Sequence, residues 1–291
     1  MAVVVARSLA EVYEALDRDP DAQLLAGGTD FMVEVNFGHR RPTSVVALRE
    51  VPELKSWRLD GQEVVVAAGC TYRELEQPEL AAAVPALAQA ARTVGSPQIR
   101  NAGTIGGNLG TASPAGDTLP VLAALDARIV IGSSSGTRTV ALDELVIGPK
   151  RTSLEHGEVI TEVRVPVVDG PQEYLKIGTR NAMVIAVADL ALVVDRAART
   201  VRCAIGSVGP TVLRAREAEQ WVAQAIDWDD GALVDDGAAK EFGSRVAADA
   251  RPIDDHRSTA AYRRHGIEVL AVRALQRALS RINGEPGRGV A

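Results

Sequence analysis

The chain has 291 residues, enough for two ordinary domains, because single hydrophobic cores usually stop growing near ~250 residues. Apolar residues make up 46% of it and charged residues 24%, which excludes wholesale disorder and collagen-like or coiled-coil compositions. The net charge of −6 and the aromatic content of 3% argue against nucleic acid as a partner, since they offer neither a basic surface nor rings for base stacking.

Cysteine usage and apolar runs indicate the compartment. Cys70 and Cys203 lie far apart and share no C-x-x-C or Cys/His spacing, so we expect no metal site in this chain. Such sparse cysteine is typical of the reducing cytoplasm. The apolar run at residues 2–6 is too short for a signal-peptide core, and the run at 182–194 is interrupted by Asp189 and falls short of a membrane span. We therefore expect a cytoplasmic protein without a membrane span.

Near the N-terminus the pattern predicts a strand, a tight turn and a helix. The apolar run at residues 23–26 ends in Gly27-Gly28. Thr29 and Asp30 then offer N-cap oxygens to an apolar segment at residues 31–37.

Further along, Asp60-Gly61 between two apolar runs predicts a β-hairpin. Thr71 and Glu74 fit a capping box, so a helix is expected to begin there. Residues 85–94 have the apolar spacing of an amphipathic helix.

The stretch at residues 95–117 is the least ordinary in the chain. From residue 99 it reads IRNAGTIGGNLGTASPAGD, and its five glycines and many small polar residues predict a long irregular loop. Such loops inside compact domains are usually functional or disordered, and the apolar residues here favour order. Asp117 is expected to cap a helix that runs through Leu125.

Residues 128–131 and 137–142 predict a second hairpin, and residues 159–167 an alternating strand. The string at residues 132–136 matches G-x-S-x-G, but its polar context favours a turn over a nucleophile elbow. The chain has neither a G-x-G-x-x-G nor a Walker motif, and its four histidines, which share no motif, are expected at the surface.

Asp169-Gly170-Pro171 is the best linker, because these turn residues separate two periodic regions. We expect one domain over residues 1–169 and a second over 172–282. The second domain is expected to contain strands at 174–177, 186–194 and 201–205 and helices at about 215–225 and 259–282. Residues 283–291 are expected to be a flexible tail.

The glycine pairs Gly27-Gly28 and Gly106-Gly107 suggest a phosphate site. Glycine lets backbone amides approach a ligand, and helix N-termini favour anions, so two such turns could hold the diphosphate of one dinucleotide. Either pair alone is more often an ordinary turn.

Six segments carry a resemblance to a known family. They are AGGTD at residues 26–30, RNAGTIGGNLGTASPAGD at 100–117, GPKRTSL at 148–154, EVITEVRVP at 158–166, YLKIGTRNAM at 174–183 and STAAYRRH at 258–265. In this order they resemble the FAD-binding (medium) subunit of molybdenum hydroxylases, the xanthine dehydrogenase and carbon monoxide dehydrogenase family. The resemblance covers nearly the whole chain.

The resemblance implies an α+β fold, with a two-part FAD-binding domain of the vanillyl-alcohol-oxidase/PCMH-like type, its parts at about residues 1–55 and 56–169. It also implies a smaller C-terminal domain with an antiparallel sheet. It implies an oxidoreductase subunit with noncovalent FAD and no catalytic residue of its own. A molybdopterin-binding large subunit and a small subunit with two [2Fe–2S] clusters would be its partners, in a dimer of heterotrimers. Electrons would pass from the clusters through FAD to NAD⁺, oxygen or another acceptor.

Site residues follow from the resemblance position by position. The first segment would wrap the diphosphate through Leu25, Ala26, Gly27, Gly28, Thr29 and Asp30, with Asp30 capping the helix rather than touching the ligand. The second would line the phosphate and ribityl oxygens through Thr104, Gly107, Asn108, Thr111 and Ser113.

Three further positions match the family. Asp117 would accept hydrogen bonds from ribose or ribityl hydroxyls, with helix capping as its alternative role. Ile160 would make an apolar contact with the flavin or the adenine. Lys176 would lie near the isoalloxazine, the alternative being an exposed strand lysine.

One departure concerns the stretch that carries a tyrosine over the flavin in some members. Met183, Val184 and Ile185 occupy it here, which leaves the electron acceptor open. Two other functions remain open as well: a free-standing FAD-dependent oxidase or reductase of the same fold, and a nonredox nucleotide-binding module.

Overall fold

A three-stranded parallel sheet begins the chain. The computed structural model describes residues 2–235 and 237–282. This first part consists of β1 (Ala2–Val5), α1 (Leu9–Arg18), β2 (Gln23–Leu25), α2 (Phe31–Asn36) and β3 (Ser44–Ala47). The strands pair in the order β1-β3-β2. The predicted strand, turn and helix are confirmed, but Asp30 at the N-cap of α2 makes no side-chain capping bond, so its expected capping role was wrong.

A five-stranded antiparallel sheet follows. Its strands are β4 (Trp57–Asp60), β5 (Glu63–Ala67), β6 (Arg128–Ser133), β7 (Gly136–Ala141) and β10 (Val159–Pro166). They pair in the order β4-β5-β10-β6-β7. Both predicted hairpins are confirmed. The G-x-S-x-G string spans the end of β6, the turn and the start of β7.

Short helices connect this sheet to its neighbours. The elements are η1 (Pro52–Leu54), α3 (Tyr72–Leu75), α4 (Pro78–Ala83), α5 (Pro85–Thr93), α6 (Pro97–Ala102), α7 (Ile105–Thr111), α8 (Thr118–Ala124) and α9 (Leu142–Leu145), with a small hairpin of β8 (Val146–Gly148) and β9 (Arg151–Thr152). The capping box of Thr71 and Glu74 at the start of α3 is confirmed.

The long irregular loop predicted at residues 95–117 was wrong, because α6 and α7 occupy much of it. Ser96 and Thr104 each begin a helix, since each side chain accepts a hydrogen bond from the backbone amide three residues on. Glycines are usually poor helix formers, but Gly106 lets α7 pack closely against Ala68, which follows β5.

The C-terminal part is a four-stranded antiparallel sheet covered by helices. Its elements are β11 (Gln172–Ile177), β12 (Ala188–Asp195), β13 (Thr200–Gly206), β14 (Leu213–Arg214), α10 (Arg216–Gln224), β15 (Ile226–Asp227), β16 (Ala232–Leu233), α11 (Ala238–Asp249) and α12 (Ala260–Ile282). The predicted strands and the helices α10 and α12 are confirmed, whereas α11 was not predicted. The predicted tail at 283–291 lies outside the described residues.

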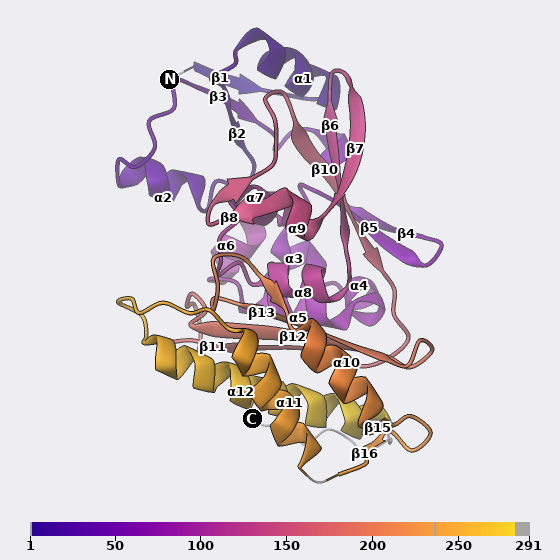
Figure 1. Ribbon diagram of the computed structural model, residues 1–291. Helices are drawn as coiled ribbons and strands as arrows, with labels where there is room; N and C mark the ends of the chain where they lie inside the picture. Colours follow the sequence, from indigo (N-terminus) through magenta and orange to yellow (C-terminus); the bar gives the residue numbers. More distant parts are fainter. Residues whose placement is uncertain (1, 236, 283–291) are drawn as a thin grey trace.

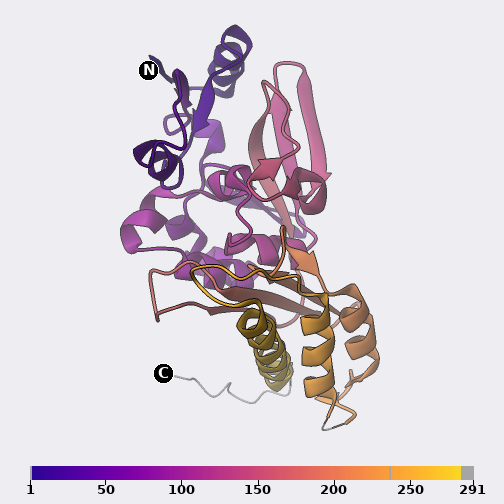
Figure 2. The same ribbon diagram turned by 60° about the vertical axis from the view of Figure 1, so that its left-hand side comes forward.

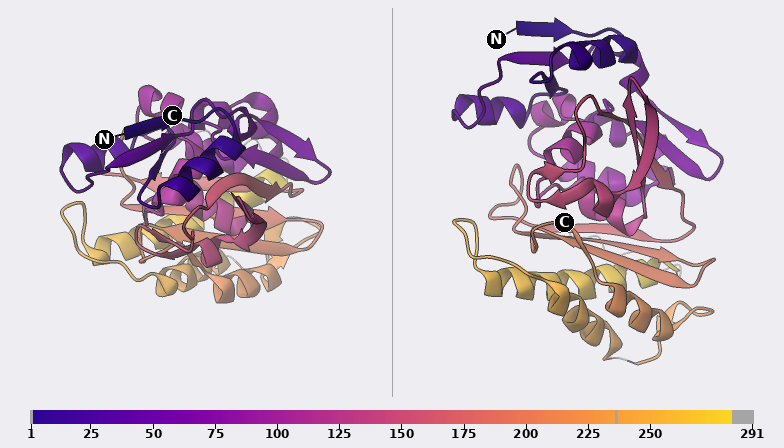
Figure 3. Two further views of the ribbon diagram at one scale, coloured as in Figure 1. Left: turned by 90° about the horizontal axis from the view of Figure 1, so that it is seen from above. Right: turned by 45° about the horizontal axis from the view of Figure 1, so that its top comes forward.

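The C-terminal sheet is buried on both faces (Figure 2). Leu190 and Leu192 of β12 face the core shared with α10, α11 and α12. Ala191 and Val193 face the core shared with α5 and α8. The N-terminal sheet lies at one end of the molecule and helices α10, α11 and α12 lie at the other. The middle sheet and the short helices lie between them (Figures 1 and 3). The predicted α+β class is confirmed.

Candidate functional site

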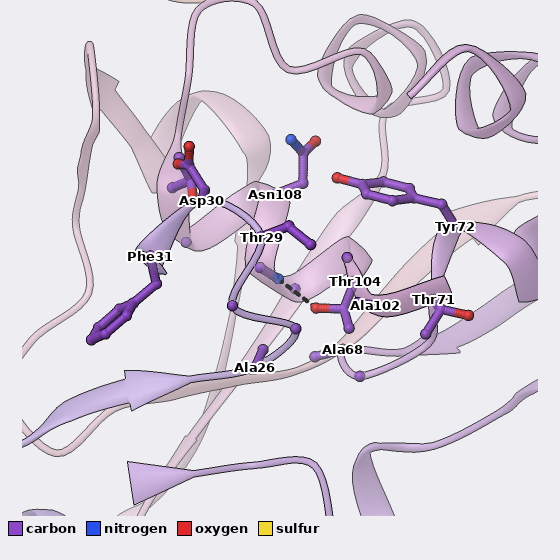
Figure 4. Close-up of a pocket in the computed structure, with 18 of the residues that line it drawn as sticks. Ala26, Thr29, Asp30, Phe31, Ala68, Thr71, Tyr72, Ala102, Thr104 and Asn108 are labelled. Atoms are coloured by element: carbon purple, nitrogen blue, oxygen red, sulfur yellow. Dashed lines mark hydrogen bonds between the residues drawn. The ribbon is translucent and has the colours of Figure 1, made fainter. Parts of the chain in front are cut away.

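A long cleft of about 1110 Å³ lies between the N-terminal and middle parts. Such a volume exceeds the roughly 300–1,000 Å³ typical of small-molecule sites, so the cleft has room for a dinucleotide. Its wall is formed by the turn after β2, the start of α3, the segment from α6 to α8, the start of β10 and the loop between β11 and β12. Figure 4 shows part of this wall, with side chains from several of these segments converging.

The glycine turn after β2 is shaped by its contact with α6. A Cβ on Gly27 would lie 1.8 Å from the carbonyl oxygen of Ala102, so only glycine fits there. Gly28 has a φ of +72°, in the left-handed region. Among the hydrogen bonds of the described residues, none is donated by the backbone amide of Gly27, Gly28, Thr29 or Asp30. This row of free donors at the cleft wall suits an anionic ligand.

Helix α7 forms the opposite side of this corner. A Cβ on Gly106 would lie 2.6 Å from the Cβ of Ala68 and 2.7 Å from its carbonyl oxygen, so this glycine serves close packing on the middle sheet. Gly107 lines the cleft, and its amide donates to Thr104 Oγ1 at 3.0 Å. A Cβ on Gly107 would lie only 3.9 Å from that of Ala26, which shows how closely the two glycine segments approach.

Polar side chains continue the wall beyond α7. The Asn108 carbonyl oxygen Oδ1 accepts a hydrogen bond from Thr118 Oγ1 at 2.6 Å. Its orientation is thereby fixed, and its amide nitrogen donates to no residue among those described. Ser113 accepts a hydrogen bond from the amide of Ala115 at 3.3 Å. Hydroxyl and amide groups held in this way can bond phosphate and sugar oxygens.

Asp117 is a buried residue of this wall, and its carboxylate is bonded to the C-terminal sheet. Its Oδ2 lies 2.8 Å from Lys176 Nζ, and its Oδ1 accepts from the Tyr174 hydroxyl at 2.9 Å. Burial raises the pKa of Asp117, and the positive charge and hydrogen bond of Lys176 oppose that rise. Asp117 stands at the N-cap of α8 without a side-chain capping bond, so the alternative capping role was wrong.

Lys176 is buried behind Asp117, and its ammonium also donates to the Thr93 carbonyl at 3.2 Å. The alternative of an exposed strand lysine was therefore wrong. Lys176 does not itself line the cleft, because Asp117 lies between Lys176 and the cleft.

Most residues singled out from the sequence meet in this one cleft. Lys176 and Leu25 are the two exceptions. The Leu25 side chain lies beneath Gly28 and supports the turn. The predicted residues that line the cleft are Ala26, Gly27, Gly28, Thr29, Asp30, Thr104, Gly107, Asn108, Thr111, Ser113, Asp117 and Ile160.

Tyr72 is a lining residue that the sequence did not reveal. It stands in the first turn of α3 with its ring against Gly103, and Figure 4 shows its hydroxyl turned toward the cleft. Burial raises its pKa, so the hydroxyl is a neutral donor at physiological pH. A lone tyrosine after a capping residue gives no sequence signal for such a role.

The loop that departs from the family pattern also borders the cleft. Met183, Val184 and Ile185 line it, and Met183 and Ile185 are about half exposed. This edge of the cleft therefore has aliphatic side chains and no aromatic one.

Within residues 2–235 and 237–282, no group of three or more His, Cys, Asp or Glu side chains could hold a metal ion. The four histidines are exposed, as expected. No helix of the described ranges is both long and apolar enough to cross a bilayer.

Comparison with known proteins identifies the fold. Residues 1–168 match the FAD binding domain in molybdopterin dehydrogenase, and residues 173–278 match the CO dehydrogenase flavoprotein C-terminal domain. The chain is 31% identical to the glyceraldehyde dehydrogenase medium chain of Sulfolobus acidocaldarius over 94% of this chain and 96% of the relative. It is 34% identical to the nicotinate dehydrogenase FAD-subunit of Eubacterium barkeri over 72% of this chain and 74% of the relative.

A solved structure agrees with these matches. The carbon monoxide dehydrogenase from Hydrogenophaga pseudoflava that lacks the Mo-pyranopterin moiety of its cofactor contains a chain that superposes with a TM-score of 0.87 and 30% identity, over 97% of this chain and 98% of that one. Fold and cleft thus define an FAD-binding subunit of an oxidoreductase. The chain belongs to the family of FAD binding domains in molybdopterin dehydrogenases. The free amides and the glycine-lined corner of the cleft fit its cofactor, FAD.

Proposed function

We propose that this chain is the electron-transfer subunit of a molybdopterin-dependent hydroxylase or dehydrogenase. FAD, when bound, accepts electrons and passes them on, and it brings its own redox chemistry. The chain's task is then to bind the cofactor, orient it and set its electrostatic surroundings. The observation that carries this proposal is the row of unbonded amides at residues 27–30, facing a cleft of dinucleotide size.

The corner between the glycine turn and α7 is the proposed diphosphate site. The amides of residues 27–30 would donate to the diphosphate oxygens, because no acceptor among residues 2–235 and 237–282 uses them. Asn108, Thr111 and Ser113 would bond the neighbouring oxygens, and Asp117 would accept from ribityl or ribose hydroxyls. Ile160 would contact a ring. Lys176 would act through Asp117, with which it forms an ion pair.

We propose the domain limits that the sequence suggested: residues 1–169 for FAD binding, in two parts at about 1–55 and 56–169, and residues 172–282 for the C-terminal domain. The change of sheet between β10 and β11 supports this division. Asp169-Gly170-Pro171 lies between those two strands.

Partners would supply the remaining redox centres. Both cysteines are buried and unpaired, and they lie in different cores, so they support partner-borne [2Fe–2S] clusters and a reducing, cytoplasmic location. A molybdopterin-binding large subunit would oxidise the substrate, and the cluster subunit would relay electrons to the flavin. The external acceptor would be NAD⁺, oxygen or another oxidant, and the assembly a dimer of heterotrimers.

Purification of the chain from its native cells tests this proposal. Two associated chains are expected, one with molybdenum and one with iron and acid-labile sulfide, together with one FAD per copy of this chain. A chain that purifies alone with FAD and oxidises an organic substrate unaided would instead be a free-standing oxidase or reductase. Binding of ADP without any flavin would indicate a nonredox nucleotide-binding module.

A further inference from the structure

A buried polar network joins the cleft wall to the C-terminal sheet. It consists of Asp117 at the start of α8, Tyr174 and Lys176 on β11, and Asp189 on β12. The Tyr174 hydroxyl oxygen lies 2.9 Å from Asp117 Oδ1 and 3.0 Å from Asp189 Oδ2. Asp189 is fully buried and stands directly opposite Lys176 in the β11–β12 pairing. Two carboxyl groups therefore share one phenol, and the inner one, Asp189, is fully buried.

The proton count of this network decides its charges. A phenol has one proton, so Tyr174 can donate to only one of the two carboxyl groups. For the other contact to be a hydrogen bond, that carboxyl group must itself carry a proton and donate to the phenol oxygen. Two buried carboxylates around one hydroxyl would otherwise repel each other. One of the two aspartates is therefore a neutral acid.

Lys176 determines which aspartate is ionised. Its ammonium lies 2.8 Å from Asp117 Oδ2 and 3.2 Å from the Thr93 carbonyl, and it makes no bond to Asp189 although the two are cross-strand neighbours. Asp117 thus has the counter-ion and the phenol proton. Asp189 has neither.

The surroundings of Asp189 suit a neutral acid. Its Oδ1 is buried and has no hydrogen-bond partner among the described residues. It lies over Gly206 of β13, where a Cβ would come within 2.3 Å of it. Burial, followed by the negative charge of Asp117, raises the pKa of Asp189 well above its usual range. An ionised carboxylate in this position would leave a charged oxygen buried without a donor.

Among the described residues, Lys176 is the positive side chain whose charge opposes the raised pKa of Asp189, but its direct contact is with Asp117. Helix α8 contributes Asp117, β11 contributes Tyr174 and Lys176, and β13 contributes a glycine. On the other face of the sheet, α12 contributes Arg263. Its guanidinium is occupied by the carbonyls of Val187 and Ser207 and by Asp255.

We propose that Asp189 is a positioning residue that keeps its proton, donates it to Tyr174, and so directs the Tyr174 proton onto the ionised Asp117. Two donors from the C-terminal sheet then hold the Asp117 carboxylate at the cleft wall. Its remaining lone pairs can accept from ligand hydroxyls. This inference rests on the proposed FAD site, because Asp117 acts there.

Infrared spectroscopy of the ligand-free chain tests the proton directly. At pH 7 a C=O band of a buried protonated carboxyl group is expected in the wild type, and it is expected to be lost in Asp189→Asn. Surface variant Asp126→Asn is the control and keeps the band. A wild type without the band, or a band that persists unchanged in Asp189→Asn, would overturn the proposal.

FAD titration tests the consequence for the cleft. Asp189→Asn should bind FAD within about twofold of the wild type at pH 7, because its amide donates to Tyr174 as the protonated acid does. Tyr174→Phe should weaken FAD binding by about tenfold, the size expected when a charged group loses a hydrogen bond. Equal affinities in all three proteins would refute the positioning role. If the wild type binds no FAD, the proposed function fails, and the infrared result still decides the proton.

Discussion

Lys176 Nζ lies 2.8 Å from Asp117 Oδ2, and both side chains are less than a tenth exposed. This ion pair connects β11 of the C-terminal sheet with the first residue of the α8 region, whose carboxylate lines the FAD cleft. A lysine more than fifty positions away in sequence thus controls the charge at the cleft wall.

Replacing Lys176 is expected to lower the stability of the folded chain. Lys176→Met leaves a buried carboxylate without its counter-ion, which costs about 3–5 kcal/mol in the free energy of unfolding at neutral pH. Urea unfolding followed by circular dichroism measures the loss. Lys240→Met, on the exposed side of α11, is the matched control and should change stability little.

The same variant gives a signed pH dependence. Burial raises the pKa of Asp117 above its unfolded value, and removal of Lys176 removes the charge that opposes that rise. A carboxyl group whose pKa is raised in the folded state binds its proton more tightly there than in the unfolded chain. The free energy of unfolding therefore falls as the pH rises from about 4 upward. Lys176→Met should therefore be closer to wild-type stability at pH 5 than at pH 8. Equal deficits at both values would contradict a role for Asp117 ionisation.

Gly107 should be essential for the cofactor and dispensable for the fold. Its Cβ position opens toward the cleft, with Thr104 Oγ1 at 3.0 Å and Ala26 Cβ at 3.9 Å as the nearest atoms. Gly107→Val should abolish FAD retention, because a branched side chain blocks the approach of a ligand to the backbone. The flavin-to-protein absorbance ratio after purification measures this. Ala82→Val, on the exposed side of α4, places the same side chain in a short helix outside the cleft and should retain flavin.

Gly27 should respond differently, because a methyl group there meets the protein itself. The added Cβ would lie 1.8 Å from the Ala102 carbonyl, so Gly27→Ala must separate the glycine turn from α6. We expect both lost FAD binding and a loss of about 1–3 kcal/mol in stability, as in overpacked cores. Thermal unfolding of the ligand-free chain separates the two effects. An unchanged melting temperature would show that this contact is looser than described.

Both thiols should be inert in the folded chain. Burial, followed by the charge of Glu74, raises the pKa of Cys70 to about 12, and burial raises the pKa of Cys203 well above its usual range. The thiolate is the reactive form, so a thiol reagent at pH 8 should label neither residue until denaturant is added. Rapid labelling of the native chain would indicate that one of the two cores opens.

The sequence predicted local structure well where short-range chemistry decides it. The Asp60-Gly61 hairpin and the Thr71–Glu74 capping box involve residues within a few positions of one another, and both are present. The segment around Gly106 was predicted as a loop, because the close contact that explains Gly106 is with Ala68, almost forty positions earlier.

The buried network depends on still longer distances. Asp117, Tyr174 and Asp189 meet only when α8 packs on the C-terminal sheet, and no local pattern indicates that contact. Asp189 instead looks like an interruption in an apolar strand. The site residues in the two glycine segments could be named from the resemblance, whereas Tyr72 and the network behind Asp117 required the structure.

The central claim is that two separated glycine segments hold one FAD. Titration of FAD into the ligand-free chain, followed by flavin fluorescence, tests it most directly when wild type, Gly27→Ala and Gly107→Val are compared under one condition. Saturation at one FAD per wild-type chain, with no saturable binding in either variant, is the predicted result. A wild type that takes up no FAD, or variants that bind it as tightly as the wild type, would contradict the account.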